Sequence, residues 1–275
     1  MASQRDKIAA FRSSHTSDSP LVLANVWDVA GARLAVAAGA TALATTSAGI
    51  SWSAGCADGD HMSGEAALDA VARIIGAVPV PVSADIESGY GRGPREVAST
   101  VAAVIAAGAA GINIEDSCPE RPGTLRPVAE QAQRIAAARA AADTAGLPVY
   151  INARTDAWWS SVGEPATRVE ESVERARAYL AAGADGIFVP GVRDAATISA
   201  LTGAIDAPVN VLVGPGALGV KELAALGVAR VTIGSSLAAA AYAVVRRAVE
   251  RLVTEGTYEP LAGGITYQEF NELMG

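Results

Sequence analysis

Two segments of the chain end in carboxylates where an apolar, β-branched run meets a loop. They are residues 84–87, which include Asp85 and Glu87, and residues 113–116, which include Glu115. Neighbouring parallel strands would direct these three acids into one small volume, where repelling carboxylates require a cation or shared protons. An oxygen-only set without a His or Cys companion favours Mg²⁺ over Zn²⁺. The alternative is that the acids are solvated loop residues.

Further polar residues fall at the C-terminal tips of other predicted strands. Arg154 suits a substrate carboxylate, because its planar guanidinium can donate two parallel hydrogen bonds; the alternative is a structural ion pair with Asp156 or a neighbouring acid. The small residues at 47–49 predict a turn whose backbone N–H groups could bind an anion, although small residues fill many tight turns. The candidate substrate-binding residues are Ser47, Ala48, Gly49, Arg154 and Asn210.

The residue that would transfer a proton is left open by the sequence. Cys118 follows the acids of 113–116 closely, although a buried inert thiol is the commoner state of a lone cysteine. His61 lies in a loop beside Asp58 and Asp60, where a lone histidine is more often a surface residue. The candidates, in order of preference, are Cys118, Glu120 and His61.

All of these residues lie within one repeated sequence pattern. Each repeat has a short β-branched run, a Gly/Pro/Asp-containing loop, and an Ala-rich amphipathic stretch that ends in glycine. Eight such repeats predict a parallel sheet closed into a (β/α)8 barrel, an α/β TIM barrel. We expect one domain over residues 1–275, with the barrel at about 20–255 and a tail at 256–275. The predicted strands are residues 21–27, 42–47, 80–87, 111–116, 149–156, 186–190, 209–213 and 230–234.

The composition narrows the classes of partner and compartment. The chain has 275 residues, of which 51% are hydrophobic and 18% charged, enough apolar residues for a substantial core. Its formal net charge is −8 and it has no Lys/Arg block, so nucleic acid is not an expected partner. Two cysteines cannot form a disulfide framework, and there is no signal peptide or apolar run long enough to span a membrane. We therefore expect a soluble cytoplasmic protein that does not bind membranes.

The C-terminal region contains an apolar helix and an aromatic tail. Residues 236–255 predict a helix whose broad apolar face would cover the barrel, and the tail at 257–275 is too apolar to be free, so it should pack on the barrel or on a partner. The upstream segment Gly214–Gly219 matches the G-x-G-x-x-G pattern, but no acid follows at the spacing that binds a ribose. Together with Gly234, Ser235 and Ser236, it instead predicts a phosphate cup.

Several of these motifs together resemble the isocitrate lyase/phosphoenolpyruvate mutase superfamily over nearly the whole chain. The resemblance implies a barrel that binds Mg²⁺ (with Mn²⁺ as an alternative) and stabilises a pyruvate-like enolate. It makes Asp85 the closest metal ligand, with Asp58, Glu87 and Glu115 around the metal's water shell, and it implies that the last helix is exchanged in a homodimer or homotetramer. The matching segments are residues 25–28, 45–49, 55–60, 84–91, 113–116, 152–156 and 188–191.

The chain departs from this family in the loop at 117–126. Isocitrate and methylisocitrate lyases carry a Lys-Cys-Gly-His segment there, and the mutase and phosphonopyruvate hydrolase branch carries an Asn- or Thr-bearing gating loop. In this chain Cys118 lacks the flanking Lys, Gly and His, so the resemblance does not transfer a catalytic role to it. Isocitrate lyase and phosphoenolpyruvate mutase activities are therefore both disfavoured.

The leading hypothesis is a Mg²⁺-dependent carbon–carbon lyase acting on a small 2-oxo or 2-hydroxy di- or tricarboxylate. Arg154 and the turn at 47–49 would hold the substrate carboxylate. The first alternative is a phosphonate-handling mutase or hydrolase on the same scaffold. The second is a catalytically silent barrel that serves in binding or assembly.

Overall fold

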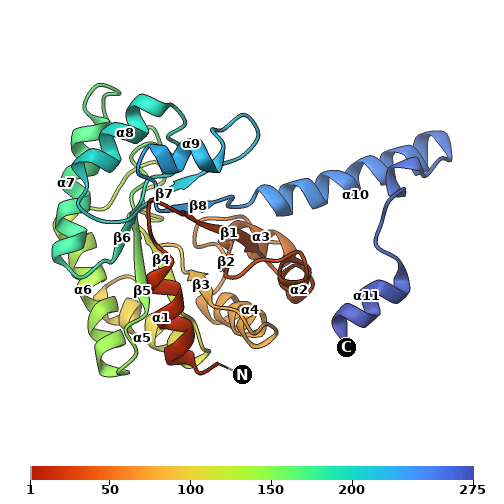
Figure 1. The fold of residues 1–275 in the computed structure, drawn as a ribbon, viewed down its shortest axis with the longest axis horizontal. Coiled ribbons are helices and arrows are strands. Elements are labelled where there is room, and N and C mark those ends of the chain that lie inside the picture. The colour runs from red at the N-terminus through yellow and green to blue at the C-terminus, as the bar shows by residue number, and fades with distance from the viewer. Residues whose placement is uncertain (1) are drawn as a thin grey trace.

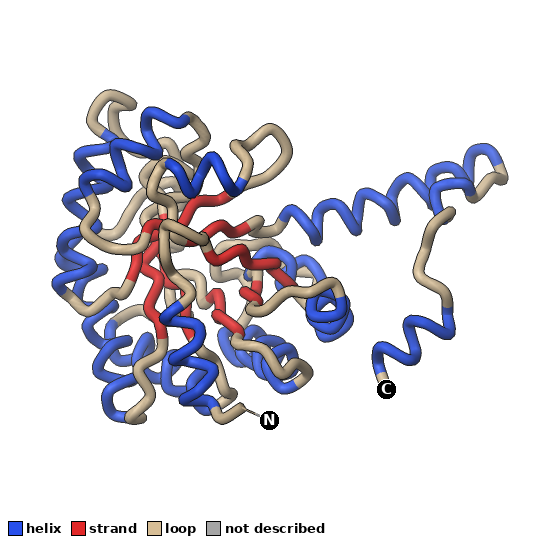
Figure 2. The backbone as a smooth tube through the Cα atoms, viewed as in Figure 1, coloured by secondary structure: helices blue, strands red, loops and turns tan. Residues whose placement is uncertain are grey.

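Eight parallel strands form a closed barrel at the centre of the computed structural model, which describes residues 2–275 (Figures 1 and 2). Each strand pairs with the next one in the chain, and β1 pairs with β8 to close the barrel. The predicted (β/α)8 fold is therefore confirmed. The strands are β1 Leu21–Val26, β2 Leu43–Thr45, β3 Val82–Asp85, β4 Gly111–Glu115, β5 Tyr150–Arg154, β6 Gly186–Phe188, β7 Val209–Leu212 and β8 Arg230–Thr232.

The strands coincide with the eight predicted runs but end one or two residues earlier. The last one or two residues of each predicted run belong to the following loop. In the register, Asp85 pairs with Asn113, and Glu115 pairs with Arg154. The barrel thus brings the polar tips of β3, β4 and β5 side by side at one end.

Helices alternate with the strands and cover the outside of the barrel (Figure 1). Several end as predicted, with a glycine in the left-handed conformation directly after the C-cap; φ is 102° at Gly108 and 103° at Gly183. The covering helices are α2 Val29–Ala37, α3 Ser47–Ser53, α4 Gly64–Gly76, α5 Pro94–Ala106, α6 Val128–Thr144, α7 Arg168–Ala181, α8 Ala195–Ala204 and α9 Val220–Ala225.

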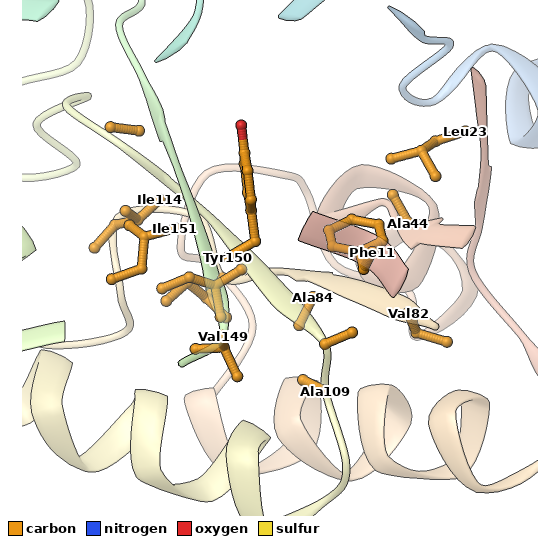
Figure 3. Close-up of a cluster of buried hydrophobic side chains, with 14 of the residues drawn as sticks. Phe11, Leu23, Ala44, Val82, Ala84, Ala109, Ile114, Val149, Tyr150 and Ile151 are labelled. Atoms are coloured by element: carbon orange, nitrogen blue, oxygen red, sulfur yellow. The ribbon is translucent and has the colours of Figure 1, made fainter. Parts of the chain in front are cut away.

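An additional helix, α1 Gln4–Ser13, precedes the predicted barrel and closes its N-terminal end. It buries Ile8 and Phe11, and Phe11 meets the ring of Tyr150 edge-on at 5.9 Å between centroids. Figure 3 shows both rings among the buried side chains at the start of the strands. His15, just beyond α1, stacks on the ring of Tyr150 at 3.8 Å between centroids and also contacts the ring of Phe11 at 4.9 Å. The barrel is therefore sealed at this end and open only at the other.

The last long helix, α10 Ser236–Glu255, has the predicted bounds but not the predicted position. It projects away from the barrel instead of covering it (Figure 1). Within it only Ala238 and Ala248 are buried, whereas Leu252 and Val253 are 56% and 76% exposed. The apolar face therefore has no partner within the described chain, and the sequence pattern alone could not specify what it packs against.

The tail after α10 folds back toward the barrel. The 3₁₀ helix η1 Glu259–Leu261 packs on α10, and α11 Tyr267–Met274 lies near α2. Arg33 of α2 donates a hydrogen bond to the carbonyl of Leu273 at 3.2 Å. Part of the tail thus contacts its own barrel, as one of the two predicted arrangements requires.

No helix within residues 2–275 combines the length and apolar character needed to cross a bilayer. The longest, α10, has 20 residues and includes the charged residues Arg246, Arg247 and Glu250.

Candidate active site

The open end of the barrel contains a cavity of about 640 Å³, a volume that includes the space open to solvent at its mouth. Barrels of this type carry their active sites at this face. Charged residues of both signs line the cavity, namely Asp58, Asp85, Arg154 and Arg230. Of the residues predicted from the sequence, the cavity brings together Ser47, Ala48, Asp58, Asp85, Arg154 and Asn210.

Asp85 ends β3 and is held in one orientation by its neighbours. One carboxylate oxygen accepts the backbone N–H of Ser47 at 3.1 Å, and the other accepts a side-chain N–H of Asn113 at 3.0 Å. Its own N–H donates to Thr45 Oγ1 at 2.8 Å. Each carboxylate oxygen keeps a further lone-pair site, so Asp85 can still bind a cation in the cavity.

Asp58 reaches the cavity from the loop between α3 and α4. Burial raises the pKa of its carboxyl, and the negative charge of Asp85 raises it further, while a hydrogen bond from the side chain of Ser47 opposes both effects. The charge of Asp85 therefore disfavours the ionised form of Asp58. A cation bound between them would remove that penalty.

Glu87 fixes the loop that carries Asp58. It accepts the backbone N–H of Asp60, and the Tyr90 hydroxyl donates to its other oxygen at 3.4 Å. The Ser88 hydroxyl also donates to the Asp60 carboxylate. Asp60, Glu87 and Tyr90 all have positive φ values, of 59°, 49° and 50°. Such strained backbone persists only where surrounding contacts over-determine it, so these loops are held rigidly beside the cavity.

The carboxyl of Glu87 titrates far above its ordinary range. Burial raises its pKa to about 8, and the charges of Asp60, Asp85 and Asp58 add to the rise, while the hydrogen bond from the Asp60 backbone opposes it. The folded protein therefore holds this proton more tightly than the unfolded chain, where the pKa is about 4.5. This difference in proton binding contributes to the free energy of unfolding. The contribution is fully present below pH 4.5 and is lost as the pH rises toward about 8.

We expect Glu87→Gln to remove this part of the pH dependence, because the amide keeps the acceptor oxygen but cannot ionise. Melting temperatures of both proteins are measured in EDTA between pH 4.5 and 8. The melting temperature of the variant should rise relative to that of the wild type as the pH increases. Parallel profiles across that window would contradict the assignment.

Arg154 forms ion pairs with two acids and also lines the cavity. Its Nε and Nη2 donate to the two oxygens of Asp156 at 2.5 and 2.9 Å, and Nη1 lies 2.9 Å from Glu115 Oε2. Burial alone would lower its pKa, but these carboxylates raise it above the usual range. Three of its five N–H groups are used, so two can still reach a ligand. The structural ion pair and the substrate-binding role are therefore compatible.

A second buried network holds the end of β5 in place. Asp116 accepts the backbone N–H of Asp156 at 2.9 Å, the hydroxyl of Tyr179 at 2.7 Å and Nη1 of Arg175 at 3.2 Å. Burial raises the pKa of Asp116, while the charge of Arg175 and these hydrogen bonds oppose the rise. Asp116 thus positions Asp156, and through it Arg154.

The segment at 47–49 is the first turn of α3 rather than the predicted isolated turn. The first N–H groups of a helix have no partner within the helix, so the predicted supply of amides is retained. Ser47 N–H is directed to Asp85, whereas Gly49 packs against Trp27, where a Cβ would come within 2.7 Å of the Trp27 Cβ. Gly49 is therefore required by packing and does not line the cavity.

The three proton-transfer candidates lie outside the cavity wall. Cys118 is buried, and its thiol donates to Glu120 at 3.3 Å. Glu120 is about half exposed and pairs with Arg126 at 3.1 Å. His61 lines a neighbouring pocket together with Glu120 and Arg126. Strand tips do not determine where such loop residues lie.

The acids near the cavity suit a hydrated Mg²⁺ rather than a closed protein cage. In residues 2–275, no three His, Cys, Asp or Glu side chains are close enough to coordinate one ion together. Mg²⁺ keeps several waters and is commonly bound through one or two carboxylates. Asp85 and Asp58 would hold it directly or through water. Glu87 and Glu115 do not line the cavity and are engaged with protein donors, so they would contact only its waters.

Two groups at the site were not among the predicted site residues. Asn113 lies within the carboxylate segment at 113–116 and orients Asp85. Arg230 begins β8 and reaches the cavity from below. A charged residue at the start of a β-branched run was the only signal for Arg230.

Comparison with known proteins decides the family. The family model for phosphoenolpyruvate phosphomutase matches residues 11–253. The chain belongs to the phosphoenolpyruvate phosphomutase family. This places it in the isocitrate lyase/phosphoenolpyruvate mutase superfamily, as the sequence motifs predicted, and that superfamily contains both lyases and phosphomutases.

Individual relatives of the phosphomutase family cover most of the chain. An uncharacterised protein of Mycobacterium tuberculosis H37Rv is 38% identical over 267 residues, which are 96% of each chain. The 2-methylisocitrate lyase of Escherichia coli K12 is 30% identical over 73% of this chain and 67% of its own. The structure of oxaloacetate acetylhydrolase with its product oxalate is 30% identical, with a TM-score of 0.87 over 99% of this chain and 94% of its own.

Proposed function

We propose that the protein is a Mg²⁺-dependent lyase that cleaves a C–C bond of a small 2-oxo or 2-hydroxy di- or tricarboxylate and releases a pyruvate-like enolate. The observation that carries the proposal is one cavity that presents Asp85, Asp58 and Arg154 together. Paired acids select a cation, and a guanidinium selects a carboxylate. The names of the 2-methylisocitrate lyase and oxaloacetate acetylhydrolase relatives agree with carboxylate substrates.

Different residues of the cavity would bind the substrate carboxylate and the metal ion. Arg154 would hold the substrate carboxylate with its remaining N–H groups, and the first turn of α3 would add backbone donors. Because Asp156 and Glu115 fix the guanidinium plane, the bound carboxylate stays coplanar with the forming enolate. When bound at Asp85, Mg²⁺ (or Mn²⁺) would supply the Lewis acid that neutralises the developing oxyanion.

Turnover of a small panel of acids tests this proposal. The purified protein is incubated with Mg²⁺ and, separately, with oxaloacetate, methylisocitrate, dimethylmalate and phosphonopyruvate. Formation of pyruvate or oxalate is measured for the first three, and formation of pyruvate or phosphoenolpyruvate for the last. We expect turnover of at least one of the first three, lost on addition of EDTA. No turnover of any of them would overturn the lyase proposal and favour the silent binding barrel.

A phosphonate mutase or hydrolase is the second candidate, and one feature favours it. The loops after β7 and β8 form a pocket lined by Gly214, Ser235 and Ser236, and Ser235 also lines the main cavity. This is where barrels often bind phosphate groups. Turnover of phosphonopyruvate alone in the panel would support this candidate.

We also propose that the protein forms a homodimer or homotetramer through residues 236–275. The argument is the unpartnered apolar face of α10 and the exposed side chains after it; Tyr258 is 69% and Leu261 61% exposed. Monomeric proteins rarely expose contiguous apolar surfaces of this kind. A second copy of the chain would bury both α10 and the tail.

Assembly is tested by placing charges on α10. We expect light scattering at micromolar concentration to give a dimer or tetramer, and Val249→Glu with Val253→Glu to give a folded monomer, since both side chains are exposed within one chain. The matched control is Val220→Glu in α9, which should leave the assembly intact. Truncation after Gly234 should give aggregated protein, because it removes the helix that a second copy would pack on and leaves the partner's matching surface exposed. A monomeric wild type would contradict the proposal.

A further inference from the structure

Arg230 is a cation buried in the barrel without a counter-ion. It is 2% exposed, lines the cavity, and its guanidinium carbon lies 5.8 Å from the centroid of the Phe11 ring in the α1 seal. In residues 2–275, its Nε and Nη1 have no hydrogen-bond partner. Burial lowers its pKa to about 10. An unpaired buried charge costs several kcal/mol, so proteins normally compensate it.

Other donors without partners face the same part of the barrel. Asn210 pairs with Arg230 in the β7–β8 register; its oxygen accepts from Thr232 Oγ1 at 3.3 Å, which leaves its Nδ2 without a partner. The Tyr150 hydroxyl also has none, and it lies against Gly186, where a Cβ would come within 2.1 Å of the oxygen. Figure 3 shows Tyr150 with its hydroxyl end pointing away from Val149 and Ala109. Arg230 and Asn210 thus line the cavity, whereas Tyr150 lies in the seal beneath it, where its ring and the Arg230 guanidinium both approach the Phe11 ring.

The acceptors already present do not compensate the charge. Ser83 Oγ and Asn152 Oδ1 are buried and without partners, but both are neutral. Among residues 2–275, the carboxylate that raises the pKa of Arg230 is that of Asp85. Its two oxygens accept from Ser47 and Asn113, toward the mouth of the cavity. The region therefore has an excess of donors and a positive charge, which suits an anion with two acceptor oxygens.

We propose that Arg230 and Asn210 form a second carboxylate-binding subsite at the floor of the cavity, separate from Arg154, with the unpartnered Tyr150 hydroxyl beneath it as a further donor. The carboxylate has two sources. It is the distal carboxylate of the substrate, in which case the inference rests on the proposed function, or a free small carboxylate that occupies the floor independently of turnover.

The test measures binding to the full-length protein by calorimetry, with acetate and malonate as probes. Tyr150→Phe removes a hydroxyl that has no protein partner, so it should leave the melting temperature unchanged and weaken carboxylate binding. Arg230→Met keeps the apolar stem of the side chain and should weaken carboxylate binding by about tenfold or more, as expected for the loss of hydrogen bonds to a charged group. The matched control is Thr202→Val in α8, whose hydroxyl donates to the carbonyl of Ile198 at 3.1 Å away from the cavity; it should lose stability and keep its affinity.

The two sources give different results in two arms. In the first arm, in EDTA, loss of acetate binding in both Arg230→Met and Tyr150→Phe identifies a site for a free carboxylate. In the second arm, in Mg²⁺, the wild type does not bind acetate, both variants bind malonate more weakly, and both bind pyruvate as the wild type does. That result identifies a site for the distal carboxylate of the substrate. Unchanged affinities for both probes in both variants would overturn the proposal. If Arg230→Met does not fold, Tyr150→Phe decides. Because no arm measures turnover, an inactive enzyme would not affect the result.

Discussion

Asp85→Ala is expected to remove Mg²⁺ binding and metal-dependent turnover together while the barrel stays folded. Asp85 is the acid whose two oxygens are both oriented in the cavity wall. Its removal leaves Asn113 without one acceptor, at a cost of about 1–3 kcal/mol, but also relieves the repulsion that raises the pKa of Asp58. Calorimetric titration with Mg²⁺, together with a thermal melt of each protein, measures both effects.

Three companion variants separate the metal site from general damage. Asp85→Asn keeps the shape and should bind Mg²⁺ equally poorly. Asp58→Asn should weaken binding by about 10–100-fold, as expected for a residue that acts around the metal. Asp206→Ala removes an exposed acid before β7 and should bind normally. An Asp85 variant with wild-type affinity for Mg²⁺ would rule out this site.

The barrel was predictable because its signal is local and repeated. Each strand is a short β-branched run, and glycines such as Gly108 and Gly183 end the helix before it in a conformation that other residues adopt poorly. α1 was not predicted, because only two buried side chains, Ile8 and Phe11, tie it to the barrel. The position of α10 was left open for a different reason. Its apolar face was compatible with covering its own barrel or with exchange between subunits, because an apolar face specifies that something covers it, not what; the structure excludes the first arrangement, and the exchange stays a prediction.

The site was predictable to the extent that strand tips define it. Asp85, Arg154 and Asn210 lie in one cavity because parallel strands end at the same face. His61 and Glu120 lie elsewhere, since their positions depend on loop paths with strained residues that no pattern encodes. Arg230 lies at the start of a strand, whereas the predicted site residues were taken from the C-terminal tips of strands, so Arg230 was not predicted. Its long side chain nevertheless reaches the cavity from below.

Arg154→Lys should lower kcat/KM although the charge is retained. The loss should correspond to about 2–4 kcal/mol of transition-state stabilisation. The guanidinium pairs with both oxygens of Asp156 and with Glu115, and it keeps two N–H groups for a carboxylate. An ammonium has three donors and no plane, so it cannot satisfy both acids and hold the substrate carboxylate flat. Both kcat and KM should therefore worsen, since binding and orientation are lost together.

The same substitution at Arg139 distinguishes this role from a structural one. Arg139 is also mostly buried and paired with an acid, Asp185, but it does not line the cavity and lies outside the network around Arg154. Arg139→Lys should lower the melting temperature and leave most turnover per folded molecule. If Arg154→Lys behaves in this way, with near wild-type kcat/KM, Arg154 serves only to bridge Asp156 and Glu115. The carboxylate specificity of the cavity would then have to come from Arg230 at its floor, and Arg230→Met would become the variant that abolishes substrate binding.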